Sequence, residues 1–181
     1  MNIKDSDLIV NQDGSIFHLR LLPEELAQTV ILVGDPERVD LIAGLLDSIE
    51  CRRYNREFKT VTGTFNGKRL SIISTGIGPD NIDIVMNEID ALANIDFHRR
   101  QVRQQLKSLN IIRIGTSGAI QEDIPCGSLI LSEKAIGFDN LSFFYQLPVS
   151  ESNKPIEHHL KSHLNLDNAY VYPYIRDASE K

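Results

Sequence analysis

Three runs of β-branched and aliphatic residues recur along the chain, and each leads into a turn that contains glycine. They read TVILVGDPERV from residue 29, RLSIISTGIGPDN from residue 69 and NIIRIGTSGAIQ from residue 110. Short continuous apolar runs that end in turn residues are typical of strands buried on both faces of a sheet. The pattern therefore predicts three central strands.

The first two turns lead into helical patterns. Asp35 is a favourable N-cap and Pro36 suits the first helical position. Apolar residues then recur at helical spacing, at Val39, Ile42 and Leu46 in the first segment and at Ile82, Val85, Ile89 and Leu92 in the second. Strands that alternate with amphipathic helices predict an α/β fold whose sheet is covered on both faces.

The segment FKTVTGTFNGKRLSII, residues 58–73, lies between these strands and contains Asn66-Gly67 flanked by alternating residues. This dipeptide is a strong signal for a tight hairpin. Part of the sheet is therefore antiparallel, and the sheet as a whole is predicted to be mixed.

The remaining segments carry weaker patterns. Residues 91–110, ALANIDFHRRQVRQQLKSLN, predict one or two helices with a charged, solvated face, and the polar segment from residue 147 contains a short helix candidate. His159 and His163 are four residues apart, as metal ligands on a helix are, but no glutamate follows His159 as a metalloprotease requires. We interpret both as exposed histidines and expect no metal there.

Composition limits the classes of partner. The 181 residues are 41% hydrophobic, enough for one globular domain, and we expect a single domain over residues 1–181. A formal net charge of -6 argues against nucleic-acid and anionic-membrane partners, because both need a positive field. Only Cys51 and Cys126 are present, and the first twenty residues lack an apolar segment, so the cytoplasm is the expected compartment.

Two of the turns carry an arginine. Arg113 lies at the end of the third predicted strand, where a permanent charge needs a carboxylate or an anionic ligand. Arg38 lies one turn into a helix whose free N–H groups favour anions, just after Gly34. A buried pair between Arg113 and a carboxylate is the structural alternative. One oxyanion shared by both turns explains both arginines, because the guanidinium matches phosphate with two parallel hydrogen bonds.

The ordered set HLRL, VGDPERV, NREF, STGIG and RIGTSGAIQEDIPCGSLIL, over roughly residues 15 to 140, resembles the nucleoside phosphorylase family. Its Arg-Ile-Gly-Thr-Ser-Gly core looks like the uridine phosphorylase branch. The resemblance implies a three-layer α/β/α sandwich with a mixed, partly barrel-like central sheet. It also implies reversible phosphorolysis, in which inorganic phosphate is the co-substrate, no other cofactor is used, and a nucleoside gives a free base and ribose 1-phosphate.

The resemblance assigns roles to individual residues. Gly34, Arg38, Arg56, Arg113 and Thr116 would bind phosphate, with Arg113 and Thr116 as the catalytic pair and Thr116 also reaching the ribose. Arg56, and His18 at the ribose 5′-hydroxyl, would act in the neighbouring subunit, which implies a homodimer that assembles into a homohexamer. Ser117 and Gly118 would line the base pocket, and Glu57 and Ser74 match positions that hold a monovalent cation between subunits. The plainer alternatives are a surface ion pair between Arg56 and Glu57 and a partly exposed His18.

The chain also departs from the family. Family members are considerably longer, and their second half carries a Glu-Met-Glu stretch for the ribose hydroxyls and a Gln/Arg pair for the pyrimidine edge. This chain has only Met1 and Met86, so Glu-Met-Glu is absent. We therefore expect an N-terminal portion of a full enzyme, or an inactive phosphate-binding chain, that lacks the C-terminal part of the fold. A purine nucleoside phosphorylase and a nucleosidase stay open, although three arginines disfavour water as the nucleophile.

Overall fold

The computed structural model describes residues 2–148, 150–166 and 170–179. The chain divides into two compact units, Met1–Ser117 and Gly118–Lys181. The single domain predicted for residues 1–181 stays a prediction.

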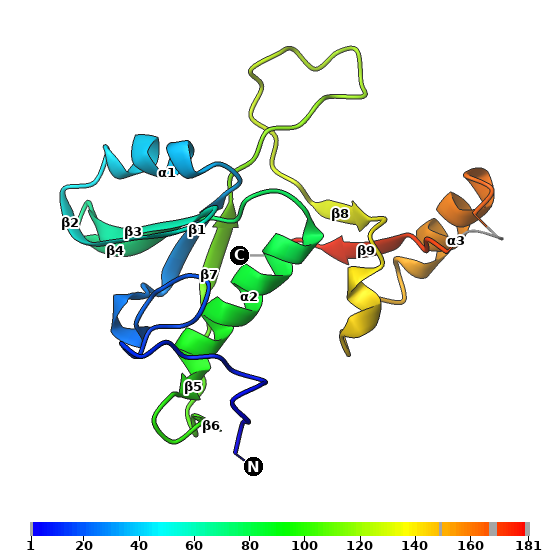
Figure 1. The fold of residues 1–181 in the computed structure, drawn as a ribbon. Coiled ribbons are helices and arrows are strands. Elements are labelled where there is room, and N and C mark those ends of the chain that lie inside the picture. Colours follow the sequence, from blue (N-terminus) through cyan, green and yellow to red (C-terminus); the bar gives the residue numbers. More distant parts are fainter. Residues whose placement is uncertain (1, 149, 167–169, 180–181) are drawn as a thin grey trace. The chain divides into compact units, whose positions relative to one another are not determined.

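The first unit is built on a five-stranded sheet with the order β2-β3-β4-β1-β7 (Figure 1). Strand β1 pairs in parallel with β4 on one side and with β7 on the other, whereas β2, β3 and β4 pair antiparallel. The predicted mixed sheet is confirmed. The strands span Thr29–Val33 (β1), Ser48–Asn55 (β2), Phe58–Phe65 (β3), Lys68–Ser74 (β4) and Asn110–Arg113 (β7).

The hairpin between β3 and β4 turns at the predicted dipeptide. Asn66 and Gly67 both adopt left-handed backbone conformations, with φ of 48° and 73°. Two such residues in succession match the twist of an antiparallel pair, which is why Asn-Gly is favoured here.

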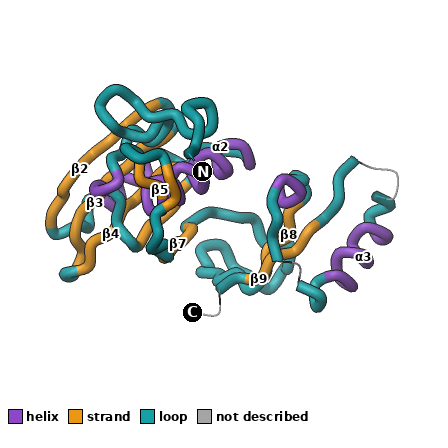
Figure 2. The backbone as a smooth tube through the Cα atoms, turned by 90° about the horizontal axis from the view of Figure 1, so that it is seen from below, coloured by secondary structure: helices purple, strands orange, loops and turns teal. Residues whose placement is uncertain are grey.

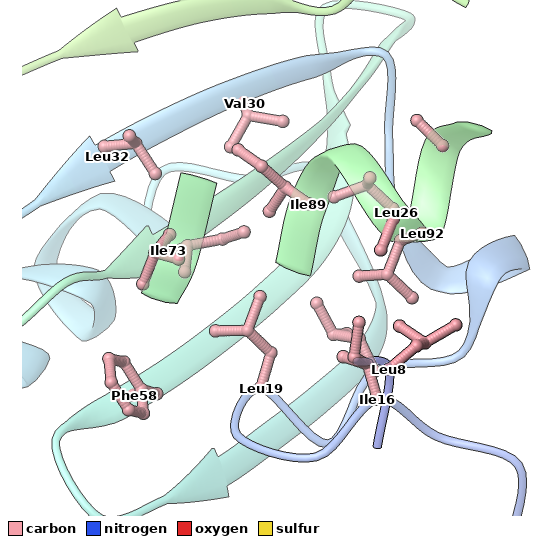
Figure 3. Close-up of a cluster of buried hydrophobic side chains, with 14 residues drawn as sticks. Leu8, Ile16, Leu19, Leu26, Val30, Leu32, Phe58, Ile73, Ile89 and Leu92 are labelled. Carbon is pink, nitrogen blue, oxygen red and sulfur yellow. The ribbon is translucent and has the colours of Figure 1, made fainter. Parts of the chain in front are cut away.

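Helices cover both faces of this sheet. Helix α1, Pro36–Ala43, packs through Val39 and Ala43 against one face, and α2, Pro79–Asn94, packs against the other. Alternation along β1 sends Val30 and Leu32 to the α2 side and Val33 to the α1 side. A short 3₁₀ helix, η1, spans Pro23–Glu25. The α2 side also buries residues from the N-terminal segment, from the position that follows η1, and from β3 and β4, among them Leu8, Ile16, Leu19, Leu26, Phe58 and Ile73 (Figure 3). The predicted α/β fold with helices flanking a mixed central sheet is confirmed.

The helices predicted for residues 91–110 are wrong beyond residue 94. Helix α2 ends at Asn94, and a small hairpin follows, formed by β5, Ile95–Asp96, and β6, Gln101–Val102. The Asn94 side chain accepts from the Lys107 backbone N–H at 2.7 Å and its backbone carbonyl accepts from Arg103 N–H at 2.8 Å. These bonds satisfy groups at the helix end from outside the helix, so the chain turns back instead of continuing.

Among its described residues, the second unit contains a two-stranded antiparallel sheet and one α-helix, joined by long loops (Figure 2). Strand β8 spans Lys134–Gly137 and β9 spans Tyr174–Asp177, with a 3₁₀ helix, η2, at Leu141–Phe144. Helix α3, Lys154–His163, confirms the short helix predicted in this segment.

The exposed face of α3 carries the two spaced histidines. The rings of His159 and His163 stack with centroids 6.1 Å apart, and both residues are exposed, as predicted. Over the residues that the structure describes, no three His, Cys, Asp or Glu side chains gather into a metal-binding group. Within the same residues, no helix has the length and apolar character needed to cross a bilayer.

Candidate active site

The carboxyl ends of three neighbouring parallel strands lie at one edge of the central sheet. In the register of β4, β1 and β7, Val33 pairs with Ser74 and Leu32 pairs with Arg113. After β1 the chain forms β2, β3 and β4 on one side of β1, and it then crosses to form β7 on the other side. The direction in which strands are added therefore reverses at β1. In open α/β sheets, ligands bind outside the carboxyl ends of the strands at such a reversal.

Gly34 and Arg113 meet at this edge. A β-carbon placed on Gly34 would lie 3.7 Å from Arg113 Nη2 and 3.7 Å from the Gly76 carbonyl oxygen. Its backbone is outside the left-handed region, so a side chain would be tolerated conformationally. The absence of a side chain therefore leaves open surface beside a guanidinium, as close approach of a ligand requires.

Arg113 is not buried, contrary to the reading of its segment as a buried strand. Strand β7 is the edge of the sheet, so Ile111, Ile112 and Ile114 are 38%, 51% and 43% exposed. The guanidinium Nη1 donates to the Ile114 carbonyl at 2.8 Å. No carboxylate among the described residues pairs with Arg113, so the alternative of a buried ion pair is not found.

Arg38 lies in the first turn of α1. The predicted cap of this helix is confirmed, because Asp35 Oδ1 accepts from the Glu37 backbone N–H at 2.8 Å. That bond directs the Asp35 carboxylate to the helix end. Arg38 is half-buried, and in the described part of the chain its guanidinium has neither an ion pair nor a hydrogen bond. The site thus contains two arginine side chains, Arg38 and Arg113, that have no carboxylate partner among the described residues. Gly34 adds a backbone segment that carries no side chain of its own.

The turn between β2 and β3 carries the third arginine. Arg56 has a left-handed φ of 57° and is exposed, and within the described residues it forms no ion pair, so the alternative pairing with Glu57 is not found. A side chain in this region stores strain, which folded proteins retain mainly where function requires it.

Glu57 and Ser74 lie together, next to Gly76. Ser74 Oγ donates to the Glu57 carbonyl at 2.7 Å and accepts from the Lys59 backbone N–H at 2.7 Å. A β-carbon on Gly76 would lie 2.8 Å from Glu57 Cγ, and Gly76 has a φ of +68°, so this glycine is required for the Glu57 side chain to cross it. The structure thus brings the two predicted cation residues side by side, while the cation itself stays a prediction.

His18 is held by a carboxylate that the sequence analysis did not find. Its Nδ1 lies 2.7 Å from Glu88 Oε1, and Glu88 also accepts the backbone N–H groups of His18 at 2.9 Å and Leu19 at 2.8 Å. The Glu88 side chain is 12% exposed and that of His18 is 25% exposed. No sequence signal indicates this pair, because Glu88 lies 70 residues away on the face of a helix.

A second unforeseen residue joins the two segments that are predicted to cross a subunit interface. Asn55 Nδ2 donates to the His18 carbonyl at 2.8 Å, and the His18 ring makes an edge contact with Phe58, with centroids 6.0 Å apart. The segment of His18 and the turn of Arg56 are therefore one continuous part of the first unit.

The remaining predicted residues lie after β7. Thr116, Ser117 and Gly118 are exposed and follow the strand as a loop, with Ser117 ending the first unit and Gly118 beginning the second. The roles predicted for them at phosphate, ribose and base stay predictions.

Comparison with protein families identifies a match over most of the chain. Residues 28–176 match the model described as the phosphorylase superfamily. The chain is 34% identical over 134 residues to the uridine phosphorylase of Thermococcus kodakarensis, which covers 74% of this chain and 43% of that protein. It is also 34% identical over 126 residues to the DeoD-type purine nucleoside phosphorylase of Alkaliphilus metalliredigens, covering 69% of this chain and 48% of that protein.

Solved structures give the same result. A nucleoside phosphorylase from Trypanosoma brucei, described as showing uridine phosphorylase activity, superposes with a TM-score of 0.86 at 36% identity, covering 96% of this chain and 58% of that one. A uridine phosphorylase from Vibrio fischeri superposes with a TM-score of 0.64 at 27% identity, covering 90% and 62%. The chain spans about half the length of the curated relatives it matches.

Proposed function

The chain belongs to the phosphorylase superfamily, and from this premise we propose that it carries the phosphate site of a nucleoside phosphorylase that converts uridine and phosphate to uracil and ribose 1-phosphate. Inorganic phosphate is the co-substrate and no further cofactor takes part. The reaction takes place in the cytoplasm, with neither nucleic acid nor a membrane as partner.

One observation supports the phosphate site above the others. The bare backbone of Gly34 faces Arg113 Nη2 at the carboxyl ends of β1 and β7. Arg38 begins the next helix with no partner for its guanidinium in the described residues. Unpaired arginines beside open backbone match the planar hydrogen-bonding pattern of a phosphate oxyanion.

The chemistry follows from where the charge is placed. Cleavage of the glycosidic bond develops positive charge on the ribose, and a phosphate fixed beneath the sugar both stabilises that charge and forms the new bond. Arg113 and Thr116 orient the phosphate, and Thr116 also contacts the ribose. Ser117 and Gly118 line the base pocket.

Assembly belongs to the same proposal. Arg56 serves the phosphate site of a neighbouring subunit, His18 reaches its ribose, and a monovalent cation between subunits uses Glu57 and Ser74. The hydrogen bond from Asn55 to the His18 carbonyl supports one interface for both segments. A two-fold dimer uses each contact twice, and dimers then form a hexamer. Sedimentation at micromolar concentration tests this, and a species that stays monomeric contradicts it.

Phosphate binding is the direct test of the site. Calorimetric titration of the 181-residue chain with phosphate should show binding, and Arg113→Ala should weaken it by about 1.5–3 kcal/mol, the range for a hydrogen bond to a charged group. Gly34→Ala should weaken it too, although the added methyl clashes with nothing, because its nearest atoms are 3.7 Å away. Gly44→Ala, at the far end of α1, is the matched control, since its backbone lies outside the left-handed region and the nearest atom to its added methyl is 3.4 Å away. Equal phosphate affinity in all four proteins would contradict the assignment.

We expect the 181-residue chain to bind phosphate without turnover, because the ribose hydroxyls and the leaving base have no partners in it. Substrate choice is therefore tested in a longer form of the chain that carries the Glu-Met-Glu stretch, by release of the base with phosphate present or omitted. Uracil released from uridine only when phosphate is present supports the proposal. Phosphate-independent release would identify a nucleosidase, and no release despite phosphate binding would identify an inactive phosphate-binding chain.

Purine nucleoside phosphorolysis is the second candidate. The chain is 34% identical to the purine enzyme of Alkaliphilus metalliredigens, the same value as for the uridine phosphorylase of Thermococcus kodakarensis, so a purine nucleoside remains a candidate substrate. A preference for inosine over uridine in the same assay would select it.

A further inference from the structure

Among the described residues, the Glu88 carboxylate contacts two backbone N–H groups and one ring nitrogen of His18. Oε1 lies 2.9 Å from the His18 backbone nitrogen and 2.7 Å from His18 Nδ1, and Oε2 lies 2.8 Å from the Leu19 backbone nitrogen. The two backbone nitrogens donate in any state of the protein. An ionised carboxylate only accepts, so the ring nitrogen that faces it carries the hydrogen.

This contact determines what the other side of the ring does. A neutral imidazole that carries its hydrogen on Nδ1 has an unprotonated Nε2, which accepts hydrogen bonds. The ring cannot turn freely, because Asn55 holds the His18 carbonyl and the rings of Phe17 and Phe58 contact the imidazole edge-on at centroid distances of 4.8 Å and 6.0 Å. His18 also lines a cavity of about 360 Å³ formed with α2 residues that include Ile84, Asn87 and Glu88.

We propose that Glu88 is a positioning residue that fixes His18 in the Nδ1–H tautomer, so that Nε2 accepts a hydrogen bond from the 5′-hydroxyl of the nucleoside. The protein therefore selects nucleosides that donate from the 5′ position over 5′-deoxynucleosides. The tautomer is a property of this chain alone, whereas its use in substrate selection rests on the proposed function.

If Glu88 only stabilised the fold, its hydrogen bonds to the backbone N–H groups of His18 and Leu19 would be sufficient for that role. Glu88→Gln separates the two roles, because the amide oxygen can still accept from the backbone of residues 18 and 19 while the amide nitrogen now donates toward Nδ1. With an amide N–H donating to Nδ1, the ring hydrogen moves to Nε2. Nε2 then donates a hydrogen bond, whereas in the unchanged chain it accepts one. Asp90→Asn is the matched control, since it removes one charge from the same helix at an exposed residue bonded to Asn94.

The first experiment reads the tautomer directly. Nitrogen-15 NMR of the His18 imidazole in the 181-residue chain distinguishes the two neutral tautomers from each other and from the imidazolium. We expect Nδ1–H in the unchanged chain and in Asp90→Asn, and Nε2–H in Glu88→Gln, with the same circular dichroism in all three. Nε2–H in the unchanged chain, or no change in Glu88→Gln, would overturn the inference whatever the protein catalyses.

The second experiment compares kcat/KM for uridine and 5′-deoxyuridine in a longer form of the chain that also carries the Glu-Met-Glu stretch used by the family for the ribose hydroxyls. Loss of one neutral hydrogen bond should reduce kcat/KM for uridine about three- to tenfold in Glu88→Gln and leave that for 5′-deoxyuridine nearly unchanged. Equal losses for both nucleosides would assign Glu88 a merely structural role and overturn the proposal. If neither nucleoside reacts with any variant, the proposed function fails, and the NMR result alone decides the tautomer.

Discussion

The first unit buries aliphatic side chains on both faces of its sheet, whereas Ile175 is the buried aliphatic side chain among the described residues of the second. The second unit relies on polar contacts. Asn153, 1% exposed, accepts from Lys134 Nζ at 3.0 Å and donates to Asp177 Oδ2 at 3.0 Å, and Lys134 also pairs with Asp177. The hydrogen bond from Lys134 keeps the pKa of Asp177 below its usual value.

This difference predicts which substitutions destabilise each unit. Apolar burial is non-directional and depends on volume, so the first unit should respond to the size of its core side chains. Hydrogen bonds depend on geometry and protonation, so the second unit should respond to single polar atoms and to pH.

The largest effect is expected in the core of the first unit. Ile89→Ala removes a side chain that is 1% exposed on α2 and should lower the free energy of unfolding by about 2–5 kcal/mol, because the cavity refills only partly. Urea denaturation measures the change in the free energy of unfolding, and amide exchange in β1 shows whether the first unit is the part that is destabilised. The control Leu41→Ala, at a residue 74% exposed, should change it by less than about 0.5 kcal/mol. Equal effects of the two variants would contradict the core assignment.

Asn153→Ala probes the second unit in the same way. It leaves Lys134 and Asp177 each short of one hydrogen bond and should lower the stability of this unit by about 1–3 kcal/mol. Faster amide exchange in β8 and β9, with β1 unchanged, is the expected result. His158→Ala, at an exposed residue of α3, is the control. If exchange in β1 accelerated equally, the two units would unfold together and the comparison would fail.

Arg56→Gly tests whether the first unit also holds strain at its candidate site. Glycine adopts the left-handed φ of 57° without a β-carbon clash, so the variant should be more stable by about 0.5–1 kcal/mol. Arg52→Gly, within strand β2, should have the opposite sign, because glycine weakens an extended strand. Thermal melts of both variants provide the measurement, and a loss of stability in Arg56→Gly would refute the strain.

The smallest effect is the alkaline response of the second unit. Burial, together with the hydrogen bond to Asp139, raises the pKa of Tyr174 to about 12. Because the pKa of Tyr174 in the folded chain exceeds the ordinary tyrosine value of 10.0, the contribution of its neutral hydroxyl to stability is complete below pH 10 and is lost as the pH rises through about 12. A phenolate absorbance step near pH 12 should disappear in Tyr174→Phe. Persistence of that step would contradict the assignment to Tyr174.

Much of the first unit follows from short stretches of sequence. The Asp35 cap, the Asn66-Gly67 turn and the apolar spacing of α2 each depend on neighbours a few residues apart, and each is confirmed. The pattern failed after Asn94, where Lys107 and Arg103 supply partners from outside the helix. Helical spacing alone does not reveal such a competitor.

The sequence by itself determined three of the strands, the helices that follow the first two turns, the Asn66-Gly67 hairpin and hence the mixed sheet, because local periodicity and turn chemistry are visible without coordinates. Only the tertiary structure decided that Gly34 faces Arg113, that β7 is an exposed edge, and that Glu88 and Asn55 hold His18. Those facts depend on sheet order and on contacts between distant segments. Their physical origin is the packing of α2 and the N-terminal segment on one face of the sheet, which no short window of sequence contains.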